Sequence, residues 1–344
     1  MQERETLLIR RCTDGDQWDD YVLENGGHPL QLWGWGQVKS GHGWVAERYF
    51  AVTEHESENG EHTSSIIGAA QVLTRKLPFP LRAFSYIPRG PVGFQDTYQA
   101  SEFLNLLADA IKRDYHSVSL SVEPPSLTFE APDGWQEGSR TVLPAQTIQL
   151  DLTKGEGDLL ANMAKKTRQY IRKSAAEAGE IRRVKSLAEL EHVLDLYHQT
   201  AKRAGFQIHN DEYYRDVFTT LADNGLVYAT YVDDQPVAFL WVAISAHTAF
   251  ELYGGMNEQG SELRANYALK WHVIRKLKEW GIETYDFGGL INGGVSVFKQ
   301  GWSETETVLA GTYDKPLSPL YKVWVAGLPA AKAVLRKSKS ILKK

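Results

Sequence analysis

The residues best suited to chemistry lie where pairs of glycines precede a lysine. Gly288-Gly289 and Gly293-Gly294 are followed by Val297-Phe298-Lys299 and then by Gly301-Trp302. Glycine lets the backbone approach a ligand closely. A lysine beside such a turn could stabilise an anion or a developing oxyanion, so Lys299 is a candidate catalytic residue. The alternative is a solvated lysine that follows a surface loop.

The segments before this turn should position it. Residues 264–280 mix apolar and basic side chains at helical spacing, with a buried stripe that includes Leu269 and Val273. Residues 282–287 then alternate as a short strand. Asp286 ends this strand, where its carboxylate could accept a proton or could only fix the turn.

A basic face is expected on a second helix. Asp158 could cap this helix, and Lys165, Arg168 and Arg172 follow at spacings of three and four residues, which stack them on one side. Like charges at that spacing destabilise a helix, so a polyanion such as a phosphate backbone could compensate for them. An ordinary basic surface helix is the alternative.

Three further candidates end predicted elements. Lys39 ends a helix that begins near Gln31, and Arg203 lies in the last turn of a helix over 187–204. Each could bind a phosphate, or could be a surface cation favoured by the helix dipole. Tyr253 closes a strand before Gly254-Gly255, where its hydroxyl could reach a ligand or be satisfied inside the core.

Composition narrows the class of protein. The chain has 344 residues, a net charge of −5, one cysteine and ten histidines. The length favours two domains, and the acidic balance argues against a general nucleic-acid binder. No histidine spacing indicates a metal site. The longest apolar run, 237–244, is far below the roughly 18 residues that span a bilayer. With no signal-peptide core, a cytoplasmic location is expected.

The order of elements predicts an α/β protein built from two similar units. Strands are expected at 44–53, 65–73, 83–87, 117–122 and 147–152 in the first unit, and at 226–232, 236–244, 248–253 and 282–287 in the second. Helices flank both mixed sheets, and one of them is expected over about 98–114 with Phe103, Leu107 and Ile111 facing inward. Asp233-Asp234-Gln235 predicts a hairpin turn, and two C-terminal helices are expected at 317–327 and 330–344. We assign 1–150 with 313–344 to the first unit and 151–312 to the second, and we expect 147–152 to close the first sheet.

Several blocks in order resemble one family. The blocks are LQLWGWGQVKSGHGW at 30–44, YIPRGPV at 86–92, NMAKKTRQYIRKS at 162–174, TAKRAGFQIH at 200–209, ANYALKW at 265–271, YDFGG at 285–289 and FKQGW at 298–302. This pattern is similar to that of the FemABX aminoacyltransferases, and it spans about residues 30 to 313. The resemblance implies two tandem GNAT-like units, of which the first is on the precursor-binding side. It also implies that C-terminal helices return to this first unit.

The resemblance also implies an activity. FemABX enzymes transfer an amino acid from aminoacyl-tRNA to the stem-peptide amine of a peptidoglycan precursor, either UDP-MurNAc-pentapeptide or lipid II, and so build the interpeptide bridge. It implies that Lys39 and Arg203 bind the precursor diphosphate, and a tRNA would then suit the basic face of Lys165, Arg168 and Arg172. Lys299 would stabilise the oxyanion. No cofactor is expected beyond the aminoacyl-tRNA co-substrate.

Two other functions share parts of this pattern. An acyl-CoA-dependent GNAT N-acyltransferase would have the same fold, but neither half contains an Arg/Gln-x-x-Gly-x-Gly/Ala phosphate loop. A non-catalytic muropeptide-binding protein would need Lys39 and Arg203 but not Lys299. The tail carries Lys332, Arg336 and four more cations without an acid, so it could contact the inner leaflet of the membrane.

Overall fold

The computed structural model describes residues 5–56, 62–138, 141–290 and 294–327. The chain divides into two compact units. Unit 1 comprises Met1–Asp14, Lys39–Val142 and Ala310–Lys344, and unit 2 comprises Gly15–Val38 and Leu143–Leu309. Each unit has its own sheet and its own core, as the order of the elements predicts.

Unit 1 is built on a seven-stranded sheet with the order β1-β2-β3-β4-β5-β15-β6. The pair β4 and β5 is parallel and the other neighbours are antiparallel. Its strands are β1 (Glu5–Arg11), β2 (Val45–Glu56), β3 (His62–Lys76), β4 (Ala83–Pro88), β5 (Ser117–Glu123), β6 (Gln136–Glu137) and β15 (Tyr313–Pro316).

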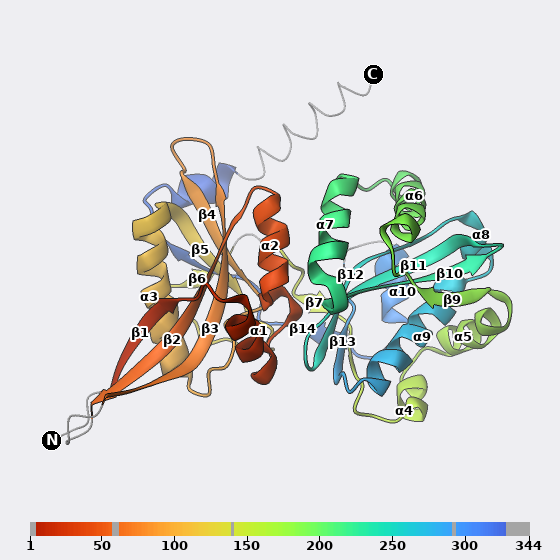
Figure 1. Cartoon of the computed structure of the whole chain (residues 1–344), viewed down its shortest axis with the longest axis horizontal. Helices are drawn as coiled ribbons and strands as arrows, with labels where there is room; N and C mark the ends of the chain where they lie inside the picture. Colours follow the sequence, from red (N-terminus) through yellow and green to blue (C-terminus); the bar gives the residue numbers. More distant parts are fainter. Residues whose placement is uncertain (1–4, 57–61, 139–140, 291–293, 328–344) are drawn as a thin grey trace. The chain divides into compact units, whose positions relative to one another are not determined.

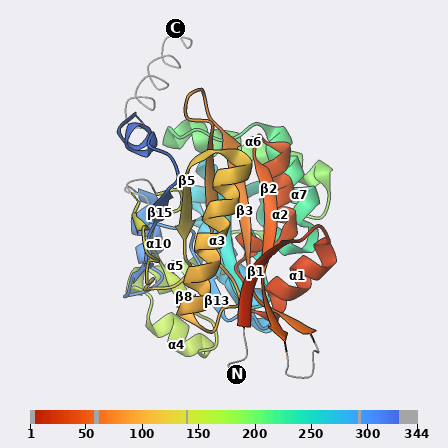
Figure 2. The same cartoon turned by 90° about the vertical axis from the view of Figure 1, so that its left-hand side faces the viewer.

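Helix α3 (Thr97–Tyr115) covers one face of this sheet (Figure 2). Asp96 caps its first turn by accepting a hydrogen bond from the N–H of Tyr98. The helix buries an apolar stripe that includes Phe103, Leu107 and Ile111, because these residues recur at helical spacing. That stripe packs on the side chains of the central strands.

Unit 2 is built on a six-stranded sheet with the order β8-β13-β12-β11-β10-β9, in which β12 and β13 are parallel. Its strands are β7 (Gln146–Thr147), β8 (Gln149–Asp151), β9 (Glu180–Arg183), β10 (Gly225–Val232), β11 (Gln235–Ile244), β12 (Thr248–Met256), β13 (Thr284–Asp286) and β14 (Thr307–Val308), of which β7 and β14 pair separately. Asp233 and Asp234 form the predicted hairpin turn with φ of 49° and 58°.

The helices of unit 2 cover both faces of its sheet, with α6 and α7 on one side and α9 and α5 on the other (Figure 1). They are α1 (Gly15–Glu24), η1 (Pro29–Gln31), α2 (Trp33–Gly41, whose end belongs to unit 1), α4 (Glu156–Ala161), α5 (Lys165–Glu177), α6 (Leu187–Ala204), α7 (Asp211–Leu221), η2 (Ala222–Asn224), α8 (Glu258–Glu262), α9 (Ala265–Glu279) and α10 (Gly294–Gln300). Successive side chains of β11 point to opposite faces of the sheet. Leu240 packs toward α9, and Phe239 packs toward Tyr197 of α6.

Two local predictions were wrong. The segment 147–152 does not close the first sheet, because β8 pairs with β13 in the sheet of unit 2. The helix expected after Asp158 is two helices, α4 and α5, and Gly155 rather than Asp158 is the N-cap residue of α4. The break at 162–164 turns α5 into a separate helix, which changes what its arginines can reach.

The chain returns to unit 1 after Leu309. Strand β15 pairs with β5, and the helical turn at 321–327 follows it. The ring of Trp324 lies 5.7 Å from that of Phe84, and Tyr321 donates a hydrogen bond of 2.7 Å to Asp314. The second C-terminal helix expected at 330–344 lies outside the described residues.

Candidate active site

Gly288-Gly289, here called the glycine turn, follows β13 and is held in place by its neighbours. Its φ values of 73° and 97° are those that glycine adopts without strain. Gly288 N–H donates to Asp286 at 2.8 Å, and Gly289 N–H donates to the hydroxyl of Thr147 at 3.1 Å. A Cβ on Gly288 would lie 2.5 Å from the carbonyl oxygen of Glu251, so only glycine fits there.

Lys299 reaches this turn from α10 rather than from a loop. Its ammonium donates to the carbonyl oxygens of Phe287 and Gly289, the latter at 2.8 Å. These two oxygens are called the carbonyl pair below. The adjacent Phe298 anchors the helix, because its ring packs 5.0 Å from that of Tyr267 on α9. The lysine is therefore fixed at one end by packing and at the other by hydrogen bonds.

Asp286 is a buried carboxylate with three kinds of donor around it. It is 2% exposed and accepts hydrogen bonds from Thr147 Oγ1 at 2.6 Å, Gln149 Nε2 at 3.0 Å and the N–H of Gly288. These bonds use the oxygens of the carboxylate to hold the glycine turn. This geometry favours the turn-fixing alternative over proton acceptance.

A buried ion pair lies beside this site, and sequence reasoning missed it. Lys270 on α9 is 4% exposed, and its ammonium contacts the carboxylate of Glu251 on β12. The signal was present, because Lys270 shares the buried face of α9 with Val273, Ile274 and Leu277. A charged residue on an apolar helix face calls for a buried partner.

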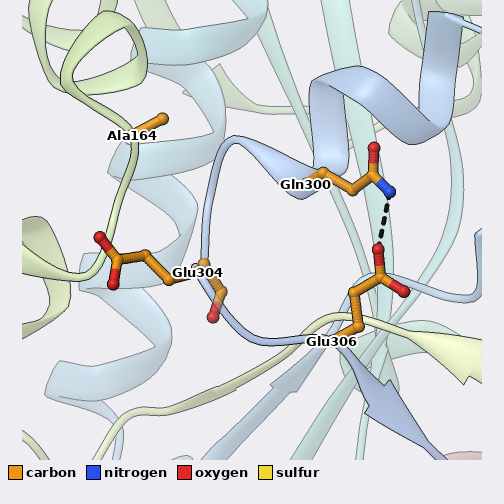
Figure 3. Close-up of a pocket in the computed structure, with 5 residues that line it drawn as sticks. Ala164, Gln300, Glu304 and Glu306 are labelled. Carbon is orange, nitrogen blue, oxygen red and sulfur yellow. Dashed lines mark hydrogen bonds between the residues drawn. The ribbon is translucent and has the colours of Figure 1, made fainter.

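A pocket of about 280 Å³ lies where α10 ends (Figure 3). Gln300 Nε2 donates a hydrogen bond of 2.7 Å to Glu306 across it. Its lining residues are Ala164, Gln300, Ser303, Glu304 and Glu306. Lys299 is not among them, because its side chain turns toward the carbonyl pair. Two exposed carboxylates give this pocket a character opposite to that of an oxyanion site.

The three basic residues of α5 that the sequence singled out have different surroundings. Lys165 and Arg172 are exposed, whereas the guanidinium of Arg168 donates to the carbonyl oxygens of Leu160 and Ala161, at 3.1 Å each, and of Met163. Arg168 thus satisfies carbonyl groups at the end of α4.

The start of α5 lies beside the end of α10. The N–H of Ala164 donates to the carbonyl oxygen of Gly301 at 3.0 Å, and the hydroxyl of Thr167 would lie 2.5 Å from a Cβ on Gly301. Gly301 is two residues after Lys299. The structure therefore brings the beginning of the basic helix close to the element that carries the candidate catalytic lysine.

Arg203 and Tyr253 lie around the same strand of unit 2. Arg203 Nη2 donates to the carbonyl oxygen of Met256 on β12 at 2.6 Å, while its side chain stays exposed. Tyr253 donates its hydroxyl to that of Tyr213 at 3.2 Å and packs against the ring of Tyr214 at 5.1 Å. Burial raises the pKa of the Tyr253 hydroxyl well above its ordinary range. Its hydroxyl is thus already engaged in an aromatic cluster.

Lys39 ends α2 within unit 1. Its carbonyl accepts hydrogen bonds from the N–H groups of His42 and Trp44, which close the helix. Burial and, to a smaller extent, the nearby charge of Arg75 lower the pKa of Lys39 to about 8. Arg75 itself lies over the ring of Trp44 at 5.6 Å. An anion bound beside these two cations would reduce their mutual repulsion.

The described ranges of the chain contain neither a metal-binding cluster nor a membrane-spanning helix. There, no group of three or more His, Cys, Asp or Glu side chains is placed to hold a metal ion. Over those same ranges, no helix combines the length and the apolar character needed to cross a membrane.

The comparisons with known proteins agree with this architecture. A family model described as an acetyltransferase (GNAT) domain matches residues 161–300. A lipid II:glycine glycyltransferase of Staphylococcus epidermidis is 20% identical over 393 residues, which cover 89% of this chain and 92% of that protein.

Solved structures extend the likeness to both units. The crystal structure of FemX superposes with a TM-score of 0.77 at 18% identity, over 92% of this chain and all of that one. A tandem GNAT protein from the clavulanic acid biosynthesis pathway gives a TM-score of 0.50 at 12% identity, over 91% of this chain and 99% of that one. The predicted mixed α/β fold with two GNAT-like units is confirmed. The chain is thus similar in sequence to lipid II:glycine glycyltransferases and similar in fold to FemX, the relatives that a FemABX aminoacyltransferase would have.

Proposed function

We propose that this chain transfers an amino acid from aminoacyl-tRNA to the stem-peptide amine of a peptidoglycan precursor and so forms an interpeptide bridge. The similarity to FemABX aminoacyltransferases supports the reaction class, and the relative from Staphylococcus epidermidis is named for glycine transfer to lipid II. The observation that carries the proposal is the position of Lys299, whose ammonium is held on the carbonyl pair beside the glycine turn.

The reaction needs little beyond orientation and charge stabilisation. The acceptor amine attacks the ester carbonyl carbon, the C–N bond forms, and the carbonyl oxygen becomes an oxyanion. The C–O bond to the tRNA ribose then breaks, and the proton lost by the amine ends on the leaving ribose oxygen or in water. An ester is already activated, so stabilising the oxyanion is the main task left to the protein.

Lys299 suits that task because of its remaining donor. An ammonium group has three N–H donors. Two are used by the carbonyl pair, and no third acceptor within the described part of the chain is recorded for it. We assign the third donor to the oxyanion. Because the carbonyl pair fixes the ammonium beforehand, little reorganisation is needed during the reaction.

The substrates are assigned to the remaining cations. The resemblance assigns Lys39 and Arg203 to the diphosphate of the precursor, and Tyr253 would contribute a packing surface more than a hydroxyl. Lys165 and Arg172 would contact the tRNA backbone, because they are exposed on the helix that starts beside α10. Arg168 would add to the positive electrostatic potential around Lys165 and Arg172 while its guanidinium donates to carbonyl groups at the end of α4.

The location follows from the substrates. Aminoacyl-tRNA is a cytoplasmic molecule, so we place the reaction on the cytoplasmic side of the membrane, with lipid II or its nucleotide-linked precursor as acceptor. The basic residues from Lys332 onward lie outside the described part of the chain, and their charge supports peripheral contact with anionic lipid.

Transfer of a radiolabelled amino acid tests the proposal directly. The full chain is incubated with each charged tRNA and with either UDP-MurNAc-pentapeptide or lipid II in detergent micelles. Labelled precursor should appear with at least one pair and should be lost in Lys299→Met. Lys112→Met changes an exposed lysine of α3 and serves as the matched control. Absence of transfer from every charged tRNA to both acceptors would contradict the proposal.

A second candidate is acyl-CoA-dependent N-acylation. The match of residues 161–300 to the GNAT model favours it. However, the connection between β12 and α9 forms the short helix α8 and lacks the glycine spacing of a coenzyme A phosphate loop. Acetyl-CoA is therefore included as an alternative donor, and its turnover in place of aminoacyl-tRNA would favour this candidate.

A further inference from the structure

The buried pair of Lys270 and Glu251 lies at the centre of unit 2. The side chains are 6% and 10% exposed, and their charged groups are in direct contact. Tyr285 donates its hydroxyl to the same Glu251 oxygen at 2.6 Å. Removing two charges from water is costly, and a buried ion pair is often no more stabilising than apolar residues of the same size. Stability alone therefore does not account for this buried pair.

The pair adjoins the residues that hold Lys299. The ammonium of Lys270 lies 4.3 Å from the ring centroid of Phe287, whose carbonyl accepts a hydrogen bond from Lys299. It lies 5.3 Å from the ring of Phe298, the neighbour of Lys299 in the chain. The positive charge of Lys299 also lowers the pKa of Lys270.

Glu251 is the anion that could displace Lys299. The groups with charge or a titratable proton that face Lys270 are Glu251 on β12, Tyr285 on β13 and Lys299 on α10, and the charge of Asp286 acts on Tyr285. Asp286 is satisfied by neutral donors around the glycine turn. Glu251 is satisfied by Lys270, and without that cation its carboxylate would attract the nearest other ammonium.

We propose that Lys270 is a positioning residue for Lys299. By neutralising Glu251 it leaves the ammonium of Lys299 on the carbonyl pair, with one donor for the oxyanion, instead of in an ion pair with that carboxylate. The proposal rests on the proposed function for the role of Lys299, and on the geometry alone for the placement of its ammonium.

The protonation of Lys270 gives this arrangement a pH dependence. The pKa of Lys270 is lowered to about 8. Burial is the main cause, the charge of Lys299 acts in the same direction, and Glu251 opposes both. As the pH rises through this value, Lys270 loses its proton and Glu251 is left without its cation. Turnover at saturating substrates should then fall, because Lys299 is drawn away from the carbonyl pair.

Three variants separate positioning from packing. In Lys270→Met we expect kcat to fall at least about tenfold while KM for the precursor stays within about twofold. In Glu251→Gln/Lys270→Met both charges are gone and Tyr285 keeps an acceptor, so kcat should recover to within about threefold of the unaltered protein. Lys276→Met, on the same helix but partly exposed, is the matched control.

The pH profile covers the case in which Lys270→Met does not fold. The double variant removes the titrating lysine and the carboxylate together, so the fall in turnover above a pH of about 8 should disappear. A folded double variant that keeps this fall would overturn the proposal, as would a folded Lys270→Met protein with unchanged kcat.

A spectroscopic test does not depend on transfer. With a carbon-13 label at the ε-carbon of lysine, the Lys299 resonance is assigned from its loss in Lys299→Arg. It should shift in Lys270→Met and return in the double variant. If the unaltered protein transfers nothing, the proposed function fails. An unshifted Lys299 resonance in folded Lys270→Met overturns the positioning role whatever the activity.

Discussion

The ammonium of Lys299 lies 2.8 Å from the carbonyl oxygen of Gly289, and the glycine places that oxygen by adopting a φ of 97°. The candidate catalytic group is thus positioned by backbone atoms whose own position depends on a conformation that favours glycine. Changes to the backbone of the turn should therefore act on the lysine without removing it.

Gly289→Ala should lower turnover by more than Gly281→Ala, which introduces the same strain of a positive φ but no steric clash. An added Cβ would lie 2.8 Å from Pro144, so the turn must move and the carbonyl pair with it. Gly281→Ala is the matched control, because it has a φ of 84° and nothing within 4 Å of its Cβ. Both variants should lose about 1 kcal/mol or more from the left-handed conformation.

The measurement is kcat for transfer together with the free energy of unfolding. We expect kcat of the Gly289 variant to be at least about tenfold below that of the Gly281 variant. Equal kcat values for the two would show that the carbonyl of Gly289 does not position Lys299.

Asp286→Asn should destabilise the protein without changing the shape of the pH–rate profile. Its carboxylate accepts hydrogen bonds from Thr147, Gln149 and Gly288, and an amide cannot accept them all. We expect a loss of about 1–3 kcal/mol in unfolding free energy. Asp195→Asn, on the exposed side of α6, should have little effect. Loss of a limb of the profile would instead identify Asp286 as the proton acceptor.

Binding of the nucleotide-linked precursor should weaken as the pH rises above about 8. Lys39 carries its charge below its pKa, which burial lowers to about 8, and loses it above that pH. At one pH unit higher, about one-tenth of the lysine is charged in the free protein, so affinity should fall by up to about tenfold. Calorimetry at two pH values measures this change.

Lys39→Arg provides the control for that titration. Arginine keeps its charge throughout the range, so precursor binding should no longer depend on pH in this variant. A pH dependence that persists in Lys39→Arg would exclude Lys39 as its source. Arg203→Ala should weaken binding at every pH that is measured, because it removes a guanidinium that we assign to the precursor.

The exposed and the capping residues of α5 should respond differently to alanine. Lys165→Ala/Arg172→Ala should weaken tRNA binding and reduce its dependence on salt, with the slope falling by about one per lost phosphate contact. Lys112→Ala, on the exposed side of α3, should leave both unchanged.

Arg168→Ala should mainly lower stability, by about 1 kcal/mol, since it frees the carbonyl oxygens of Leu160 and Ala161. Filter binding over a salt series and thermal unfolding measure the two effects. Equal loss of tRNA affinity in the Arg168 variant, without loss of stability, would contradict this division of roles.

Much of the fold was determined by local sequence. The stripe of Phe103, Leu107 and Ile111 predicts α3, and the two aspartates at 233–234 predict the hairpin, because periodicity and turn preference act over a few residues. The ordered blocks also indicated the resemblance to the FemABX aminoacyltransferases, and the glycine turn indicated Lys299. These features need no knowledge of what packs against them.

Tertiary structure decided which groups meet. Periodicity tells which face of a helix is buried but not which charge lies opposite, so it could not pair Lys270 with Glu251 or direct Arg168 to the carbonyls of α4. A strand of three residues has too few side chains to specify its sheet, and only the pairing of β8 with β13 settles it. The position of Lys299 likewise depends on backbone oxygens, which every residue has and no sequence pattern distinguishes.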